Sequence, residues 1–271
     1  MRLVFSGVLV ALAAPGAASA QQQDTTPPDT SITSGPQVNP GGRGGQVGAT
    51  QSRTASFFFT STEAGSTFEC KVDLGSTPGA YAPCTSPRSF TALPDGRHIF
   101  WVRAKDAAGN VDPSPATFIW QVDNSEPFGG MVNKPRPLEN VNGYMFAFGP
   151  ISHVEDGGHF QCKLDAGDWA VCHPANAYGI GGLSDGPHTF SVRAVDLAGN
   201  IDSTPDTVTW VVDTIPPETT ITSGPSGVTN STAARFEFTQ ADAHPSSRFE
   251  CKLDAGEWAA CNSPKEFTAL L

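Results

Sequence analysis

The chain has 271 residues, of which only 16% are charged, and its formal net charge is −11. Lys and Arg form no run, which argues against a nucleic-acid partner, because phosphate binding needs clustered positive charge. The 28 Gly and 23 Pro are too many for a helical protein, whereas 17 Phe and 5 Trp indicate packed cores. A chain of this length suits two or three domains.

The first 20 residues have the features of a secretory signal peptide. Arg2 supplies a positive n-region, Leu3 to Ala14 is apolar, and Ala18-Ser19-Ala20 is a small-residue cleavage site. A membrane anchor is the alternative, but the stretch is too short to span a bilayer, and we expect no membrane insertion after cleavage. Export predicts a secreted or cell-surface protein whose six cysteines form disulfides.

One short segment occurs three times and defines a repeat. FQCKLDAGDWAVC at 160–172 returns as FECKLDAGEWAAC at 249–261, and the longer FECKVDLGSTPGAYAPC lies at 68–84. Cys162 and Cys251 are 89 positions apart, which is the size of a sandwich domain rather than of a solenoid repeat. We therefore predict three copies after the signal peptide at 1–20. They are domain one at 21–123, domain two at 124–213 and a partial domain three at 214–271.

Each copy is predicted to consist of short strands. Apolar residues alternate within them, as in Phe57/Phe59 and Phe118/Trp120, which places these side chains on one face. About seven such strands, bounded by Gly, Pro, Asn and Asp, predict an all-β antiparallel sandwich. Residues 36–50 are predicted to be a loop. The strands are TSIT (30–33) and TTIT (219–222); FFFT (57–60), FAFG (146–149) and FEFT (236–239); the cysteine segment; a strand around Phe90, Tyr178 and Phe267; HIFWVRAKD (98–106) and HTFSVRAVD (188–196); TFIWQVD (117–123) and TVTWVVD (207–213).

The cysteine segment is predicted to be a β-hairpin closed by a disulfide. Ala166-Gly167-Asp168 would be its turn, with Gly167 at positive φ. A three-residue loop would place Cys162 opposite Cys172, within reach of a disulfide. Zinc is the alternative, but spacings of ten or fourteen are not the close pairs of structural zinc sites. The expected disulfides are Cys70–Cys84, Cys162–Cys172 and Cys251–Cys261.

The string DGPHTFSVRAVDLAGNIDSTPDTVTWVVDTIPPETTITSGP (185–225), joined to the hairpin, resembles immunoglobulin-like (fibronectin III-like) repeats of large secreted actinobacterial repetitive proteins. The same signature occurs at 95–123, and the resemblance covers nearly all of 24–271. It implies tandem immunoglobulin-like sandwiches of about seven strands that act as spacers or adhesive stalks at the cell surface. The alternative that it implies is an accessory or ligand-binding module of a larger secreted enzyme.

Two parts of the chain depart from the repeat pattern. Residues 125–144 replace the PPDTSITSGP opening, so the first strand of copy two is in doubt. Copy three ends at FTALL, where copy one continues as FTALPDGRHIF. The strands with the repeated His and Trp are therefore absent from copy three, which predicts an open edge and a fragment of a longer protein.

Two acidic turns are weak calcium candidates, and no other cofactor is expected. DAAGNVD (106–112) and DLAGNID (196–202) do not have EF-hand spacing. The favoured interpretation is a hairpin turn in which Gly-Asn takes left-handed dihedral angles. The oxygen donors would come from Asp106, Asn110, Asp112, Asp196, Asn200 and Asp202, and the linker acids Asp123, Glu126, Asp213 and Glu218 could complete an interdomain site.

Neither the recurring histidines nor the hairpin aromatics indicate catalysis. His98 and His188 follow Asp-Gly and are interpreted as structural hydrogen-bonding groups. Tyr81, Trp169 and Trp258 could stack on a sugar, although packing on the disulfide or the sheet is favoured. No G-x-S-x-G, H-E-x-x-H or phosphate-binding loop is present, so no enzyme activity is expected. The expected partner is a surface protein or glycan of unknown identity.

The linkers between copies are short and contain proline. They read VDNSEP (122–127) and VDTIPPE (212–218). Proline restricts φ, so the linkers should be stiff, which predicts a monomeric rod.

Overall fold

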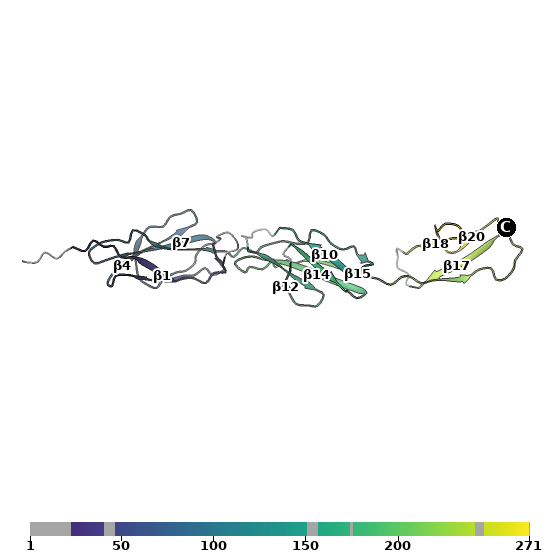
Figure 1. Ribbon diagram of the computed structural model, residues 1–271, viewed down its shortest axis with the longest axis horizontal. Helices are drawn as coiled ribbons and strands as arrows, with labels where there is room; N and C mark the ends of the chain where they lie inside the picture. The colour runs from purple at the N-terminus through teal and green to yellow at the C-terminus, as the bar shows by residue number, and fades with distance from the viewer. Residues whose placement is uncertain (1–22, 41–46, 151–156, 174–175, 242–246, 271) are drawn as a thin grey trace, which may run out of the picture. The chain divides into compact units, whose positions relative to one another are not determined.

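The computed structural model describes residues 23–40, 47–150, 157–173, 176–241 and 247–270 (Figure 1). All regular elements among them are β-strands, as predicted, and no described helix could cross a membrane. The chain divides into two compact units. The first comprises the residues up to Gly129 with Pro150–Phe160 and Arg193–Thr204, and the second comprises the remainder. The second sequence copy contributes to both units.

Copy one forms two sheets. The smaller has the order β1 (Thr30–Ser34), β3 (Ala55–Ser61), β6 (Arg88–Phe90). The larger has the order β2 (Ala49–Thr50), β8 (Ala116–Val122), β7 (Gly96–Lys105), β4 (Thr67–Leu74), β5 (Ala82–Cys84). All neighbours are antiparallel except β2 and β8, which are parallel.

Strand β2 corrects one sequence prediction. It lies within residues 36–50, which were expected to be a loop, so that prediction was wrong for Ala49 and Thr50. The edge of β8 recruits them, because Gln121 N–H donates to Gly48 O and Asp123 N–H donates to Thr50 O, both at 3.0 Å.

Copy two repeats this arrangement with a shorter small sheet, in which β10 (Gly143–Ala147) pairs with β13 (Ala177–Gly181). In place of a first strand, the described residues form a single bridge between Met131 and Phe148, so the doubt about 125–144 was justified. The larger sheet has the order β12 (Ala170–Val171), β11 (His159–Leu164), β14 (Gly186–Val195), β15 (Asp206–Val212), β9 (Leu138–Glu139).

Copy three keeps the small sheet and only part of the larger one. Its described residues contain no counterpart of β7 or β8, the strands at the centre of the larger sheet of copy one. The small sheet has the order β16 (Thr219–Ser223), β17 (Ala234–Gln240), β20 (Lys265–Phe267), and the rest is the hairpin of β18 (Phe249–Cys251) and β19 (Ala259–Cys261).

Stacked phenylalanines join the two sheets of each complete copy. Phe57 of β3 stacks on Phe100 of β7, with ring centroids 4.1 Å apart and an interplanar angle of 14°. Trp120 of β8 packs beside them, 5.2 Å from Phe57, and all three side chains are fully buried. In copy two, Phe146 stacks on Phe190 at 3.9 Å. The alternation predicted for these strands is confirmed, since every second residue of β7 faces the core.

All six cysteines form disulfides within the hairpins, in the pairs Cys70–Cys84, Cys162–Cys172 and Cys251–Cys261. Their Cα atoms are 5.8, 5.5 and 5.8 Å apart, inside the usual range for a disulfide.

The predicted register and turn of this hairpin were wrong. Cys162 pairs with Ala170 rather than Cys172, so the disulfide is diagonal. The positive φ is at Asp165 (50°), and Gly167 is not in the left-handed region. The counterpart Asp254 has a φ of 48°, so the aspartate is the left-handed residue of this turn in copy three as well. In copy two, Asp165 N–H donates to Thr189 O of β14 at 2.7 Å and Asp165 Oδ1 accepts from Thr189 N–H at 2.7 Å. A short polar side chain tolerates this conformation.

We expect removal of one disulfide to destabilise its own copy. The double substitution Cys162→Ala and Cys172→Ala should lower the free energy of unfolding of copy two by about 2–3 kcal/mol, because the unfolded chain regains the entropy of an open loop. Urea denaturation followed by amide exchange in β11 and β14 would measure this. The matched control is Cys70→Ala with Cys84→Ala, which should affect copy one and leave β14 unchanged. Equal stability of the variant and parent copy two would contradict the expectation.

The stacked pair predicts a contrast between copies. Phe57→Ala should cost about 3–5 kcal/mol of folding free energy, because it removes a fully buried ring from between the sheets. Phe236→Ala, at the equivalent position of β17, should cost clearly less, because Phe236 is only half-buried. Denaturation midpoints of the two variants give the comparison. Equal losses of folding free energy would show that the stack is not the main contributor to the stability of copy one.

Candidate functional site

The acidic turns use their first carboxylate to hold their own backbone. Asp106 accepts from the N–H groups of Gly109 and Asn110 and from Asn110 Nδ2, each at 2.7 Å. Asp196 accepts from the equivalent groups of Gly199 and Asn200 at 2.7–2.8 Å. These bonds support the turn interpretation. The left-handed residue is the glycine alone, with φ of 98° at Gly109 and 94° at Gly199.

The second carboxylate of each turn is buried and anchors the next segment. Asp112 Oδ1 accepts from Ser114 N–H at 2.7 Å, and Asp202 Oδ1 accepts from Thr204 N–H at 2.8 Å. Burial raises the pKa of Asp112, but hydrogen bonds from Thr30 and Ser114 outweigh it and hold the pKa below its usual value. A carboxylate held in this way stabilises the loop as an anion.

A second acidic group, which the sequence did not predict, includes Asp106 of the turn at 106–112. Oxygen atoms of Asp24, Glu63 and Asp106 lie within 4.8 Å of one another. The pKa of Glu63 is raised by burial and then by the negative charges of Asp24 and Asp106. These residues come from three distant segments, so no local motif could reveal the group. Asp112 is not part of it, and calcium binding stays a prediction.

Side chains of the turns also bind the segment that enters each copy. Asn110 Nδ2 donates to Asp24 O, and Asn200 Nδ2 donates to Asp123 O, both at 3.0 Å. Ser203 Oγ donates to Glu126 Oε2 at 2.6 Å. Two of the four linker acids therefore contact the second turn. For the other two, Asp213 Oδ1 accepts from Ile215 N–H and Glu218 O accepts from Ala241 N–H.

The two turns differ in burial. Leu197 and Ala198 form a small buried cluster with Ala49 in the first compact unit, and Asn39 Nδ2 donates to Leu197 O at 3.0 Å. The equivalent Ala107 and Ala108 are exposed. The second turn is therefore a packed structural element, and the first is open to solvent.

The repeated histidines are hydrogen-bonding groups of the core, as expected. His188 Nε2 donates to Ser184 O at 2.8 Å, and its Nδ1 lies 2.9 Å from Asp165 Oδ2. Both partners only accept, so the geometry favours the doubly protonated ring. The pKa of His188 is raised, first by the bond to Ser184 O and then by Asp165. Burial raises the pKa of Asp165, but the bonds from Thr189 and His188 outweigh it, so that pKa is lowered.

In copy one, the histidine at the same position has different hydrogen-bond partners. His98 Nε2 donates to Pro94 O at 2.9 Å, and its Nδ1 is buried without a hydrogen-bond partner among the described residues. Asp73, the counterpart of Asp165, accepts from Trp101 Nε1 at 2.7 Å and from Lys71 at 3.1 Å instead. The carboxylate is thus engaged away from the imidazole.

The three hairpin aromatics have different surroundings. Arg103 covers the ring of Tyr81 at 4.1 Å and is itself paired with Glu69 at 2.7 Å. Trp169 is half-buried. Trp258 is 62% exposed, with Lys252 Nζ 5.4 Å from its ring. The ligand roles of Tyr81, Trp169 and Trp258 stay predictions.

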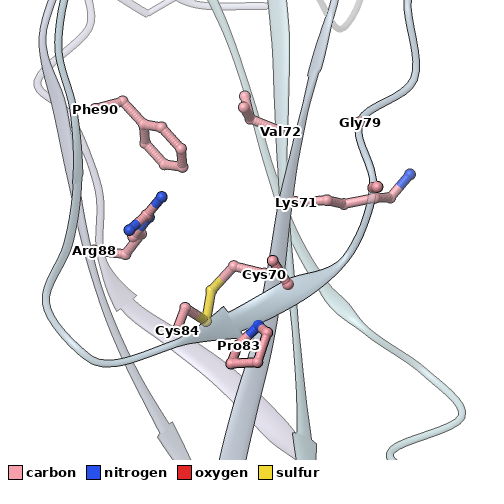
Figure 2. A pocket seen from close by; sticks show the side chains of 10 residues that line it. Cys70, Lys71, Val72, Gly79, Pro83, Cys84, Arg88 and Phe90 are labelled. Atoms are coloured by element: carbon pink, nitrogen blue, oxygen red, sulfur yellow. A yellow bond between two sulfur atoms is a disulfide. The ribbon is translucent and has the colours of Figure 1, made fainter.

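Grooves lie beside two of the hairpins. In copy one, a groove of about 230 Å³ opens between the β4–β5 hairpin and β6. Figure 2 shows the Cys70–Cys84 disulfide and Pro83 at one end, with Arg88 and Phe90 across from Val72. In copy three the equivalent space is larger, about 420 Å³, because the central strands of the larger sheet are not among its described residues. Its apolar lining includes Ile221, Phe236, Phe238, Phe249, Trp258 and Phe267.

Strand order defines the class of fold. The antiparallel order β4–β7–β8 faces β1–β3–β6 in copy one, so this copy has the fold of an immunoglobulin-like β-sandwich, and the larger sheet of copy two repeats the order. Two details depart from antibody domains. The disulfide lies within one sheet, and the core Trp is on the last strand.

No family model matches the sequence, and no curated protein matches it. Solved structures match at low identity. Fibronectin(III)-like modules of Clostridium thermocellum CbhA are 16% identical, with 68% of this chain and 94% of that chain covered and a TM-score of 0.39. A tetra-tandem repeat from the extending region of a large adhesion protein is 17% identical, with 81% and 62% covered and a TM-score of 0.29. At these values the likeness carries no functional argument.

The His188–Asp165 pair predicts a pH dependence. Because the pKa of His188 is raised on folding, its stabilisation is complete below the unfolded pKa of about 6.5 and is lost as pH rises through the folded pKa. We expect copy two to become less stable from pH 6 to pH 9, and His188→Gln to flatten this slope. Asp165→Asn should also flatten it, and a slope unchanged in both variants would contradict the role of the pair. Urea denaturation at several pH values is the measurement.

Proposed function

We propose that this chain is an exported, non-enzymatic array of immunoglobulin-like modules that acts as a structural spacer or adhesive stalk at the cell surface. The observation that carries the proposal is the threefold repetition of a hairpin closed by its own disulfide, with all six cysteines paired. Disulfides persist in oxidising surroundings, so each module is stabilised for work outside the cytoplasm. Repetition of one module lengthens the protein and requires no additional binding or catalytic site.

The attachment of the linkers supports a mechanical role. In the first two copies, the asparagine of the acidic turn binds a backbone carbonyl of the entering segment, at Asp24 and at Asp123. A segment tied to its module and followed closely by proline has little freedom to rotate. Stiff joints would keep successive modules apart, which is what a monomeric spacer requires.

A ligand-binding role is the second candidate, either in a free adhesin or as accessory modules of a larger secreted enzyme. The specific observation in its favour is Trp258, which is exposed beside an apolar groove. A surface protein or glycan would be the partner. Glycan-array binding that is lost in Trp258→Ala and kept in Trp169→Ala would favour this function over a passive spacer.

The spacer proposal predicts the dimensions of residues 21–271 in solution. A compact globule of roughly 250 residues has a radius of gyration of about 18 Å. Small-angle X-ray scattering should give a clearly larger value, and a variant with Gly and Ser at residues 214–217 should give a broader distribution of distances. A radius near that of the compact globule would refute the spacer function.

A further inference from the structure

Arg88 is a charged side chain on the core-facing side of the small sheet of copy one. It lies opposite Phe57 in the register of β3 and β6, and directly opposed residues of an antiparallel pair point to the same face. Phe57 is fully buried in the core, whereas Arg88 is exposed at the edge of the sandwich. The guanidinium carbon lies 5.2 Å from the centre of the Phe90 ring, beside the groove (Figure 2).

The equivalent position of copy two holds an aromatic residue that packs on the core. Tyr178 of β13 lies opposite Phe146, as Arg88 lies opposite Phe57. The Tyr178 ring is nearly parallel to that of Phe190, with centroids 5.8 Å apart and an interplanar angle of 20°. An apolar ring can therefore fill this position, so packing of the sandwich does not require the arginine of copy one.

Arg88 gives the groove an unbalanced positive charge. The described residues that line the groove include two cations, Arg88 and Lys71, and no acid. Lys71 points away from Phe90 (Figure 2), and its Nζ lies 3.1 Å from Asp73 Oδ1. The ion pairs among the described residues do not include Arg88. The groove therefore complements an anion.

The remaining walls of the groove are mainly apolar and enclose a small space. Val72 lies across from Phe90, and the Cys70–Cys84 disulfide and Pro83 lie at one end (Figure 2). The volume of about 230 Å³ is below the usual range of ligand pockets, about 300–1,000 Å³, so the groove suits a small molecule. A peptide strand fits poorly, because Pro83 at the centre of β5 has no N–H to donate to an added strand.

We propose that this groove binds a small organic carboxylate whose apolar body has about the size of one benzene ring. The carboxylate would lie on the guanidinium of Arg88, whose planar fork matches two carboxylate oxygens. The apolar body would cover Val72 and Phe90 and remove their surface from water. A phosphate monoester matches the site less well, because it carries about −1.5 to −2 charge at pH 7 and Arg88 supplies a single unpaired positive charge. The site lies within one module and is independent of the spacer function.

The test is an NMR titration of the isotope-labelled chain, residues 21–271, with phenylacetate. We expect saturable shifts of the amide signals of Val72, Cys84 and Phe90, with a dissociation constant of roughly millimolar order for a ligand of this size. Phenethyl alcohol, the neutral analogue, should bind about five- to tenfold more weakly, because it cannot form an ion pair with Arg88.

Two arginine variants separate the carboxylate contact from the apolar contact. Arg88→Gln should weaken binding of phenylacetate by about five- to tenfold and leave binding of phenethyl alcohol unchanged. Arg97→Gln is the matched control, because Arg97 is an exposed arginine of β7 that does not line the groove, and this variant should bind both compounds like the parent.

Four outcomes would overturn the proposal. They are the absence of saturable shifts at the groove amides, equal affinity for phenylacetate and phenethyl alcohol, unchanged affinity of Arg88→Gln for phenylacetate, and tighter binding of phenyl phosphate than of phenylacetate. None of these results bears on the dimensions of the chain in solution, so failure of this site and failure of the spacer function are distinguishable.

Discussion

The stack of one phenylalanine from each sheet is the interaction on which each complete module depends. Phe57 on Phe100, and Phe146 on Phe190, place two rings in parallel contact at the centre of the sandwich. Strand alternation then fixes which neighbours are buried, so the Trp and Val of the last strand and the His of β7 or β14 enter the same core. The imidazole of His188 binds Ser184 O and Asp165 Oδ2, both outside β14, whereas His98 binds Pro94 O through Nε2 only, among the described residues.

The disulfide and the stack stabilise different levels of structure. The disulfide closes a hairpin between neighbouring strands and involves at most fourteen residues of separation. The stack joins strands of opposite sheets that are more than forty positions apart, in Phe57 and Phe100. The disulfide therefore holds a hairpin within one sheet, and the stack holds the two sheets together.

Features that depend on local periodicity could be predicted from the sequence. Features that depend on contacts between segments distant in the sequence could not. Alternating Phe residues located the strands, and the segment that occurs three times located the disulfides. The hairpin register was missed, because the spacing of the cysteines suits a diagonal disulfide as well as a directly opposed one, and the backbone pairing of Cys162 with Ala170 decides between them. The group formed by Asp24, Glu63 and Asp106 was missed because folding alone brings these distant segments together.

The acidic turns show how one motif can serve both a module and its joint. The Asp at the start of the motif closes the turn, the Asp at its end anchors the next segment, and the Asn between them is left to bind the entering linker. Conservation of the contacts between the first two copies therefore fits a motif used for joining modules. Because the three side chains have separate roles, the turn is repeated together with the strands that it connects.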